Sequence, residues 1–152
     1  MKLLLIAFLT FINSTSIELN QVRKLYVDAV RSKEACENLI NRLNKIREDD
    51  ALLHGYRGSG IIIMAKHVIN PISKYSNFKK GRDILEKAVT KDKNNIELRF
   101  LRLMIQSNLP KFLGYKSNIS EDLDFINENL NKEKDLQLKE FISNSLKNNK
   151  LK

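Results

Sequence analysis

The sequence predicts an all-α fold of about six or seven helices in one compact domain. Strands are disfavoured because only five glycines and two prolines are available for the tight turns that β-hairpins need. Apolar residues recur at intervals of three and four along most of the chain, which is the spacing of one face of an α-helix. With 152 residues, 42% of them hydrophobic and 30% charged, the chain is also long enough to bury a core.

The amino-terminal stretch MKLLLIAFLTFINSTS is typical of an export signal. Lys2 supplies the basic start, residues 3–12 form an apolar run, and small polar residues follow. About ten apolar residues are too few for a hydrocarbon core that needs roughly twenty, so we expect no membrane span in the mature chain. A buried first helix is the alternative. The expected division of the chain is a signal peptide at 1–16, a single helical domain at 17–146 and a frayed basic tail at 147–152.

Two amphipathic helices are expected first, over about 18–31 and 32–46. Ser32 is suited to the N-cap of the second helix, and Cys36 stands in register with Leu43 on its apolar face. Cys36 is the only cysteine, so an internal disulfide is excluded. We expect it to act as a small buried hydrophobe, with a reactive thiol as the alternative.

A third helix is expected over about 51–69, and a fourth from about residue 74 or 76 to residue 90. Asn70-Pro71 separates them, since proline keeps its predecessor out of the helical region. The run G-x-x-G-x-G from Gly55 to Gly60 resembles a phosphate loop, but no Lys-Ser/Thr pair follows and no strand precedes it. Small residues at this spacing favour close approach of a neighbouring helix, and we prefer this interpretation to phosphate binding.

The fifth helix follows a polar turn at 91–95 and ends near Pro110. Asn94 and Glu97 resemble a capping box, which would turn the Glu97 carboxylate back to the first helical turn. This position requires no acid-catalyst role for Glu97.

The sequence of this helix, IELRFLRLMIQSN, is apolar on most sides but carries one polar row. The row consists of Arg99, Arg102 and Gln106, which fall within about 60° of one another on a helical wheel. It is either a solvated strip or a set of structural ion pairs with residues such as Asp122 or Glu86, or else a strip that faces a ligand.

A connection at 111–119 precedes a sixth helix, for which the Ser120 hydroxyl is a suitable N-cap. Acidic residues follow directly, at the positive end of the helix dipole. A seventh helix is expected over 134–146, burying Leu138, Phe141 and Ile142.

Residues 78–95, FKKGRDILEKAVTKDKNN, resemble the second helix and turn of a tetratricopeptide repeat. The matching packing positions are Phe78, Gly81, Leu85 and Ala88. The turn departs from the family at Lys93, where proline is usual, and the next helix has its polar row where the family places large apolar residues. The match covers about one repeat, and it implies a degenerate array of helix hairpins that stack on their neighbours.

A wider resemblance involves residues 94–126 together with YRG and MAKHV upstream. These stretches are similar to an uncharacterised family of small exported proteins of flavobacteria and their relatives. The resemblance implies export, to the periplasm or outside a Gram-negative bacterium, and one helical domain. It supplies no catalytic residue to transfer.

The formal net charge of +9 could favour acidic partners such as nucleic acid, acidic polysaccharide or anionic lipid. However, the lysines are spread along the chain and no aromatic residues alternate with them as in base-stacking surfaces, so nucleic acid is not the expected partner. We expect another envelope protein or a peptide.

No catalytic or metal-binding site can be recognised in the sequence, and we expect no cofactor. His54 and His67 lie thirteen residues apart, which does not place two ligands on one helical face. Ser59 stands between two glycines but lacks the sequence around a nucleophile elbow. An enzyme is therefore not the expected class.

Two functional hypotheses follow. The first is an exported protein-interaction or ligand-binding module of the cell envelope that uses a groove between paired helices. The alternative is a small enzyme or carrier with a polar pocket around Arg57, His67, Arg99 and Arg102. The candidate binding residues are Tyr56, Arg57, His67, Arg99, Arg102 and Gln106.

Overall fold

The computed structural model describes residues 18–151, which form seven α-helices and two short 3₁₀ helices, with no strand among them. The bounds are α1 (Leu19–Ala29), α2 (Lys33–Arg42), α3 (Ala51–His67), α4 (Pro71–Lys91), α5 (Ile96–Asn108), η1 (Lys111–Leu113), α6 (Ile119–Asn129), η2 (Leu130–Lys132) and α7 (Leu136–Asn148). The all-α prediction with six or seven helices is confirmed. The expected signal peptide at 1–16 lies outside the described residues.

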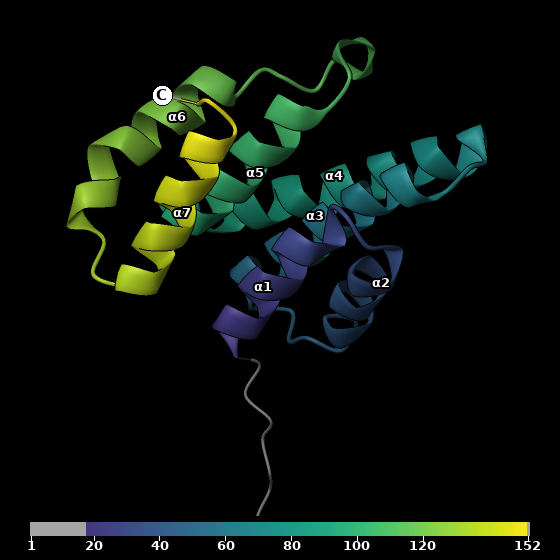
Figure 1. Ribbon diagram of the computed structural model, residues 1–152, viewed down its shortest axis with the longest axis horizontal. Helices are drawn as coiled ribbons and strands as arrows, with labels where there is room; N and C mark the ends of the chain where they lie inside the picture. The colour runs from purple at the N-terminus through teal and green to yellow at the C-terminus, as the bar shows by residue number, and fades with distance from the viewer. Residues whose placement is uncertain (1–17, 152) are drawn as a thin grey trace, which may run out of the picture.

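Helix α3 is the centre of the fold and packs against α1, α2, α4 and α5. Figure 1 shows α3 and α4 as a long hairpin, with α1 and α2 beside α3 and with α5, α6 and α7 grouped together. Buried apolar side chains from all seven helices form one continuous core. The α3 sequence is apolar around most of its circumference because it has a neighbour on nearly every side.

Helices α3 and α4 approach to backbone contact where Gly58 faces Gly81. A Cβ atom added at Gly58 would lie 2.8 Å from the Gly81 carbonyl oxygen and 2.8 Å from the Leu85 nitrogen. A Cβ atom added at Gly81 would lie 2.5 Å from the Gly58 carbonyl oxygen. No side chain fits at either position, so the close-packing interpretation of the glycine run is confirmed.

Helix α4 begins earlier than the sequence analysis predicts. Pro71 occupies its first turn, where the missing N–H is not needed for the helix ladder. The Asn70 side-chain oxygen caps the helix by accepting a hydrogen bond from the Ile72 nitrogen at 2.8 Å. The dipeptide that we expected only to end the third helix therefore also starts the fourth.

The caps of other helices differ in kind. Ser32 caps α2 as expected, accepting a hydrogen bond from the Ala35 nitrogen at 3.2 Å. Helix α6 has Asn118 as its N-cap residue, not Ser120, and the Asn118 side chain contacts α5 instead of capping its own helix.

At the carboxyl end, α7 continues to Asn148 and Leu151 packs against the core. The helical region thus reaches into residues 147–152, which we expected to be a frayed tail. Within residues 18–151, no helix combines the length and the apolar character needed to cross a membrane.

Candidate functional site

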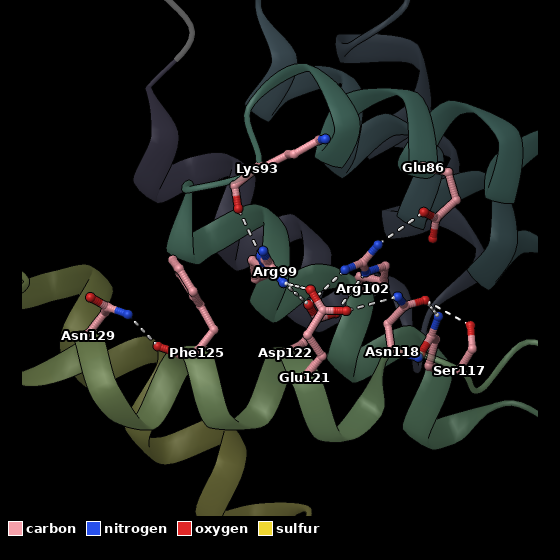
Figure 2. Close-up of polar contacts among 11 residues, drawn as sticks. Glu86, Lys93, Arg99, Arg102, Ser117, Asn118, Glu121, Asp122, Phe125 and Asn129 are labelled. Atoms are coloured by element: carbon pink, nitrogen blue, oxygen red, sulfur yellow. Dashed lines mark hydrogen bonds and ion pairs between the residues drawn. The ribbon is translucent and has the colours of Figure 1, made fainter.

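The polar row of α5 lies in an interface with α6, which Figure 2 shows in close-up. Its members stand three and four residues apart, so they share one face of α5. We call this interface the ion-pair seam. It comprises Glu86, Arg99, Arg102, Gln106, Asn118, Glu121 and Asp122.

Arg102 is the centre of the seam. Its Nε and Nη2 atoms donate to the two oxygens of Asp122 at 2.7 and 2.8 Å, and Nη1 donates to Glu86 Oε2 at 3.1 Å. Burial alone would lower the Arg102 pKa, but the hydrogen bonds and charges of Asp122 and Glu86 outweigh it and raise the pKa. Arg102 therefore has its charge matched by two carboxylates, as Figure 2 makes visible.

Arg99 extends the seam toward solvent. Its Nη1 donates to Glu121 Oε1 at 2.7 Å and to Asp122 Oδ1 at 3.0 Å, while Nε donates to the Lys93 carbonyl at 2.8 Å. The guanidinium carbon also lies 4.6 Å from the centre of the Phe125 ring, a cation–π distance. The Arg99 hydrogen bond lowers the pKa of the exposed Glu121 carboxyl.

Gln106 completes the row. Its Nε2 donates to Asn118 Oδ1 at 3.2 Å, and its Oε1 accepts from the Asn118 nitrogen at 3.1 Å. The side chain is fully buried. These two hydrogen bonds fix the start of α6 against α5. They account for the N-cap residue being Asn118 and not Ser120.

The polar row is thus engaged in structural contacts. Asp122 and Glu86 are the two partners that the sequence analysis named for the ion-pair interpretation, and both are bonded to Arg102. Because Asp122 is completely buried, the pairs also prevent a carboxylate and two guanidinium groups from being left uncompensated inside the protein. The arrangement holds α6 onto α5.

A second buried ion pair joins Arg23 of α1 to Glu97 of α5. The Arg23 Nε and Nη2 atoms donate to the two Glu97 oxygens at 2.8 and 2.9 Å, and the Tyr56 hydroxyl donates to Glu97 as well. Hydrogen bonding to Glu97 raises the Arg23 pKa, and burial raises the pKa of Tyr56. Asp135, the N-cap residue of α7, adds a 3.2 Å ion pair to Arg23. Helices α1, α3 and α5 therefore meet at the Glu97 carboxylate, and the start of α7 joins them through Arg23.

The capping-box expectation for Glu97 is wrong. The N-cap residue is Asn95, whose side chain accepts hydrogen bonds from the Glu97 and Leu98 nitrogens, so the Glu97 side chain is free to reach Arg23. Arg23 was not among the residues selected from the sequence. The available signal was that Arg23 and Glu97, of opposite charge, each interrupt the apolar face of a predicted helix.

The remaining sequence-selected residues lie apart from the seam. Tyr56 belongs to the Glu97 cluster, Arg57 donates to Asn44 Oδ1 at 3.4 Å, and His67 Nε2 lies 2.6 Å from the Ala29 carbonyl oxygen. In the described part of the chain, no hydrogen bond or ion pair connects Arg57 or His67 to the α5 row. The same residues contain no group of three or more His, Cys, Asp and Glu side chains that could hold a metal ion.

Cys36 is buried as expected. Its thiol donates to the Gly60 carbonyl at 3.2 Å, and burial raises its pKa to about 11. A thiol that stays protonated and enclosed has little nucleophilic reactivity at neutral pH.

A groove lies on a different face of α5. It has a volume of about 980 Å³ and is formed by α1, α3, α4, α5, η1 and α7. From α5 it receives Phe100, Met104 and Asn108, which stand four residues apart and point away from the polar row. Other apolar walls are Tyr26, Val27, Val30, Ile62, Ile63, Phe78 and Phe112.

The rim of the groove is basic. Arg31, Lys66 and Lys74 contribute to the lining, and among the described residues no aspartate or glutamate does. Lys66 donates to the Val30 carbonyl at 3.1 Å, and none of the three cations has an ion-pair partner within residues 18–151. An apolar floor with uncompensated cations at its edge suits an apolar ligand that carries negative charge.

Comparison with family models, with curated proteins and with solved structures found no match to this chain. The groove and the charges around it are therefore the features that indicate a function.

Proposed function

We propose that this protein is an exported binding module of the cell envelope, and that its groove holds an apolar, acidic segment of another envelope protein. The observation that carries the proposal is the groove of about 980 Å³ with apolar walls and a rim containing cations but no carboxylate among the described residues. Grooves of this kind accept the apolar face of an amphipathic helix or an extended peptide.

The walls of the groove leave apolar surface exposed in the free protein. Val27 is 45% exposed, Tyr75 is 61% exposed and Phe112 is 86% exposed, and all three line the groove. A contiguous apolar surface with a polar rim is typical of a protein interaction site, because covering it removes apolar area from water.

The rim indicates the chemistry of the bound segment. Arg31, Lys66 and Lys74 would attract a segment whose apolar residues are flanked by Asp or Glu, and would repel basic segments. The resemblance of residues 78–95 to a tetratricopeptide repeat supports the same proposal, since helical-repeat domains bind partners on their concave surfaces.

Site-specific photocrosslinking tests this proposal. Benzoylphenylalanine placed at Val27, in the groove, should crosslink to a protein in envelope extract of the source bacterium, and the same group at Leu136, which is exposed elsewhere, should not. Ala65→Phe, which fills the groove, should abolish the crosslink at Val27. Identical products from both positions, or products unaffected by Ala65→Phe, would contradict the proposal.

Binding of 1-anilinonaphthalene-8-sulfonate, an apolar anion, provides a second readout on the purified protein. The dye should bind the wild type, and the Lys66→Gln/Lys74→Gln variant should bind it several-fold more weakly because rim charge is lost. The matched control is Lys132→Gln/Lys139→Gln, whose side chains do not line this groove. Equal affinity in all three proteins would place dye binding outside the groove.

A carrier of small anionic amphiphiles is the second candidate function. It is favoured by the groove volume, which lies within the roughly 300–1,000 Å³ of small-molecule sites. A carrier would bind a fatty acid such as laurate one-to-one with displacement of the dye, and would give no protein crosslink at Val27.

A further inference from the structure

An apolar edge borders one end of the groove. It consists of Ile69, Ile72, Tyr75 and Phe112, with exposed fractions of 95%, 80%, 61% and 86%. Ile69 lies in the turn between α3 and α4, the next two lie in the first turns of α4, and Phe112 lies in η1. Tyr75 and Phe112 both line the groove, so the α4 start and η1 flank the same opening. Figure 1 shows the α3–α4 turn as a projecting end of the hairpin.

The edge is unusual in its extent. Single exposed apolar residues are normal on a protein surface, whereas clusters are not. Ile69 and Ile72 do not line the groove, and both are highly exposed. Their exposure therefore needs an explanation separate from the proposed function.

The segments of the chain that carry the edge contain charges of one sign. Residues 51–82 and 103–120 contain no aspartate or glutamate, and these two segments include every residue of the apolar edge. Lys66, Lys74 and Lys111 lie within a few positions of the edge residues. Ile72, Tyr75 and Lys79 are three and four residues apart, so apolar and basic side chains share one face of α4.

We propose that the apolar edge docks this protein onto an anionic lipid surface. The isoleucines and Phe112 enter the boundary between headgroups and acyl chains, and the surrounding lysines meet the lipid phosphates. Nucleic acid or acidic polysaccharide would match the lysines but would give exposed aliphatic side chains nothing to enter. A lipid interface accommodates both the aliphatic side chains and the lysines. We therefore prefer an anionic lipid surface to nucleic acid or acidic polysaccharide as the partner.

Vesicle sedimentation tests this proposal. The chain from residue 17 onward is used, because it contains all seven described helices and their core but not the apolar run at 3–12. Vesicles of phosphatidylcholine with about one-third phosphatidylglycerol should bind it at least about tenfold more strongly than vesicles of phosphatidylcholine alone.

Ile69→Ser/Ile72→Ser should weaken binding to the anionic vesicles about tenfold or more. The matched control is Leu136→Ser, because Leu136 is also an apolar residue with 76% exposure but lies at the start of α7, outside the edge. Circular dichroism establishes that each variant is folded.

Three results would overturn the proposal: no binding of the wild type, equal binding to both vesicles, or equal losses in the edge variant and Leu136→Ser. If Lys66→Gln/Lys74→Gln weakened vesicle binding and Ile69→Ser/Ile72→Ser did not, the result would indicate a soluble polyanion as the partner. That outcome would overturn the proposal too. The test is independent of the proposed function, since Ile69→Ser/Ile72→Ser leaves the groove lining intact and Ala65→Phe leaves the edge intact.

Discussion

The two faces of helix α5 differ in whether the charged groups beside them are paired. On one face, Arg99 and Arg102 are bonded to carboxylates and Gln106 is bonded twice to Asn118. On the other face, Phe100 and Met104 line a groove whose cations have no carboxylate beside them among the described residues. The charged face, which is conspicuous in the sequence, holds the fold together. The apolar face, which looks like ordinary core, borders the open groove.

This difference teaches that a regular row of charged residues on a helix is not by itself a site. What distinguishes a site is incomplete pairing. The arginines of the seam are completely paired, and the lysines at the rim of the groove are not.

Removal of the buried carboxylate should have the largest effect. Asp122→Ala leaves Arg99 and Arg102 without their shared partner inside the protein, and we expect a loss of about 3–5 kcal/mol in the free energy of unfolding. Urea unfolding monitored by circular dichroism measures it. Asp124→Ala, at an exposed position of the same helix, should change stability by less than about 0.5 kcal/mol. If both variants lose equal stability, the seam is not what holds α6 in place.

The second effect tests the link between the helix packing and the groove. Gly58→Ala places a methyl group 2.8 Å from α4 backbone atoms, and we expect a loss of about 1–3 kcal/mol. Because Ile62 and Phe78 lie on the two helices that are forced apart, affinity for the anilinonaphthalene dye should also change.

Gly114→Ala is the control for this experiment. An added Cβ there meets nothing within 4 Å, and the positive φ of 66° alone should cost about 1 kcal/mol. A Gly58→Ala variant as stable as the wild type would show that α3 and α4 can separate without penalty.

The smallest effect concerns the exposed margin of the seam. Glu121 is 61% exposed, so Glu121→Gln should reduce stability by less than about 1 kcal/mol at neutral pH. The Arg99 hydrogen bond lowers the Glu121 pKa in the folded protein, so its contribution is present above the ordinary value of 4.5 and is lost as the pH falls through the lowered pKa.

Urea midpoints measured from pH 7 to pH 3 should therefore converge for the wild type and Glu121→Gln at the acid end. Glu128→Gln, an exposed position on α6, serves as control and should leave the acid-side slope unchanged. A wild-type midpoint that exceeds that of Glu121→Gln by a constant amount across this range would contradict the assigned ion pair.

Much of the fold follows from local patterns. Apolar spacing located all seven helices, and the glycine run in α3 correctly indicated a close neighbour. The start of α4 was missed because Pro71 was interpreted as a break, although proline also suits a first helical turn. Local signals thus find helices more reliably than their ends.

The polar contacts were only partly predictable. Asp122 and Glu86 could be named as partners of the arginine row because they are acidic and belong to neighbouring helices. The partner of Glu97 could not, because Arg23 is 74 residues away and nothing local brings α1 to the start of α5. The groove was expected only as a type of surface, since its walls come from six separate elements.

The contact between Gly58 and Gly81 also determines how the groove can move. Side chains between two helices normally adjust to a small sliding motion, but here backbone meets backbone and no such adjustment exists. We therefore expect helices α3 and α4 to move together as one rigid body. Widening of the groove must come from α1, α5, η1 or α7. Spin labels on α3 and α4 should keep one separation when the groove is filled, while labels on α1 and α4 should report the opening.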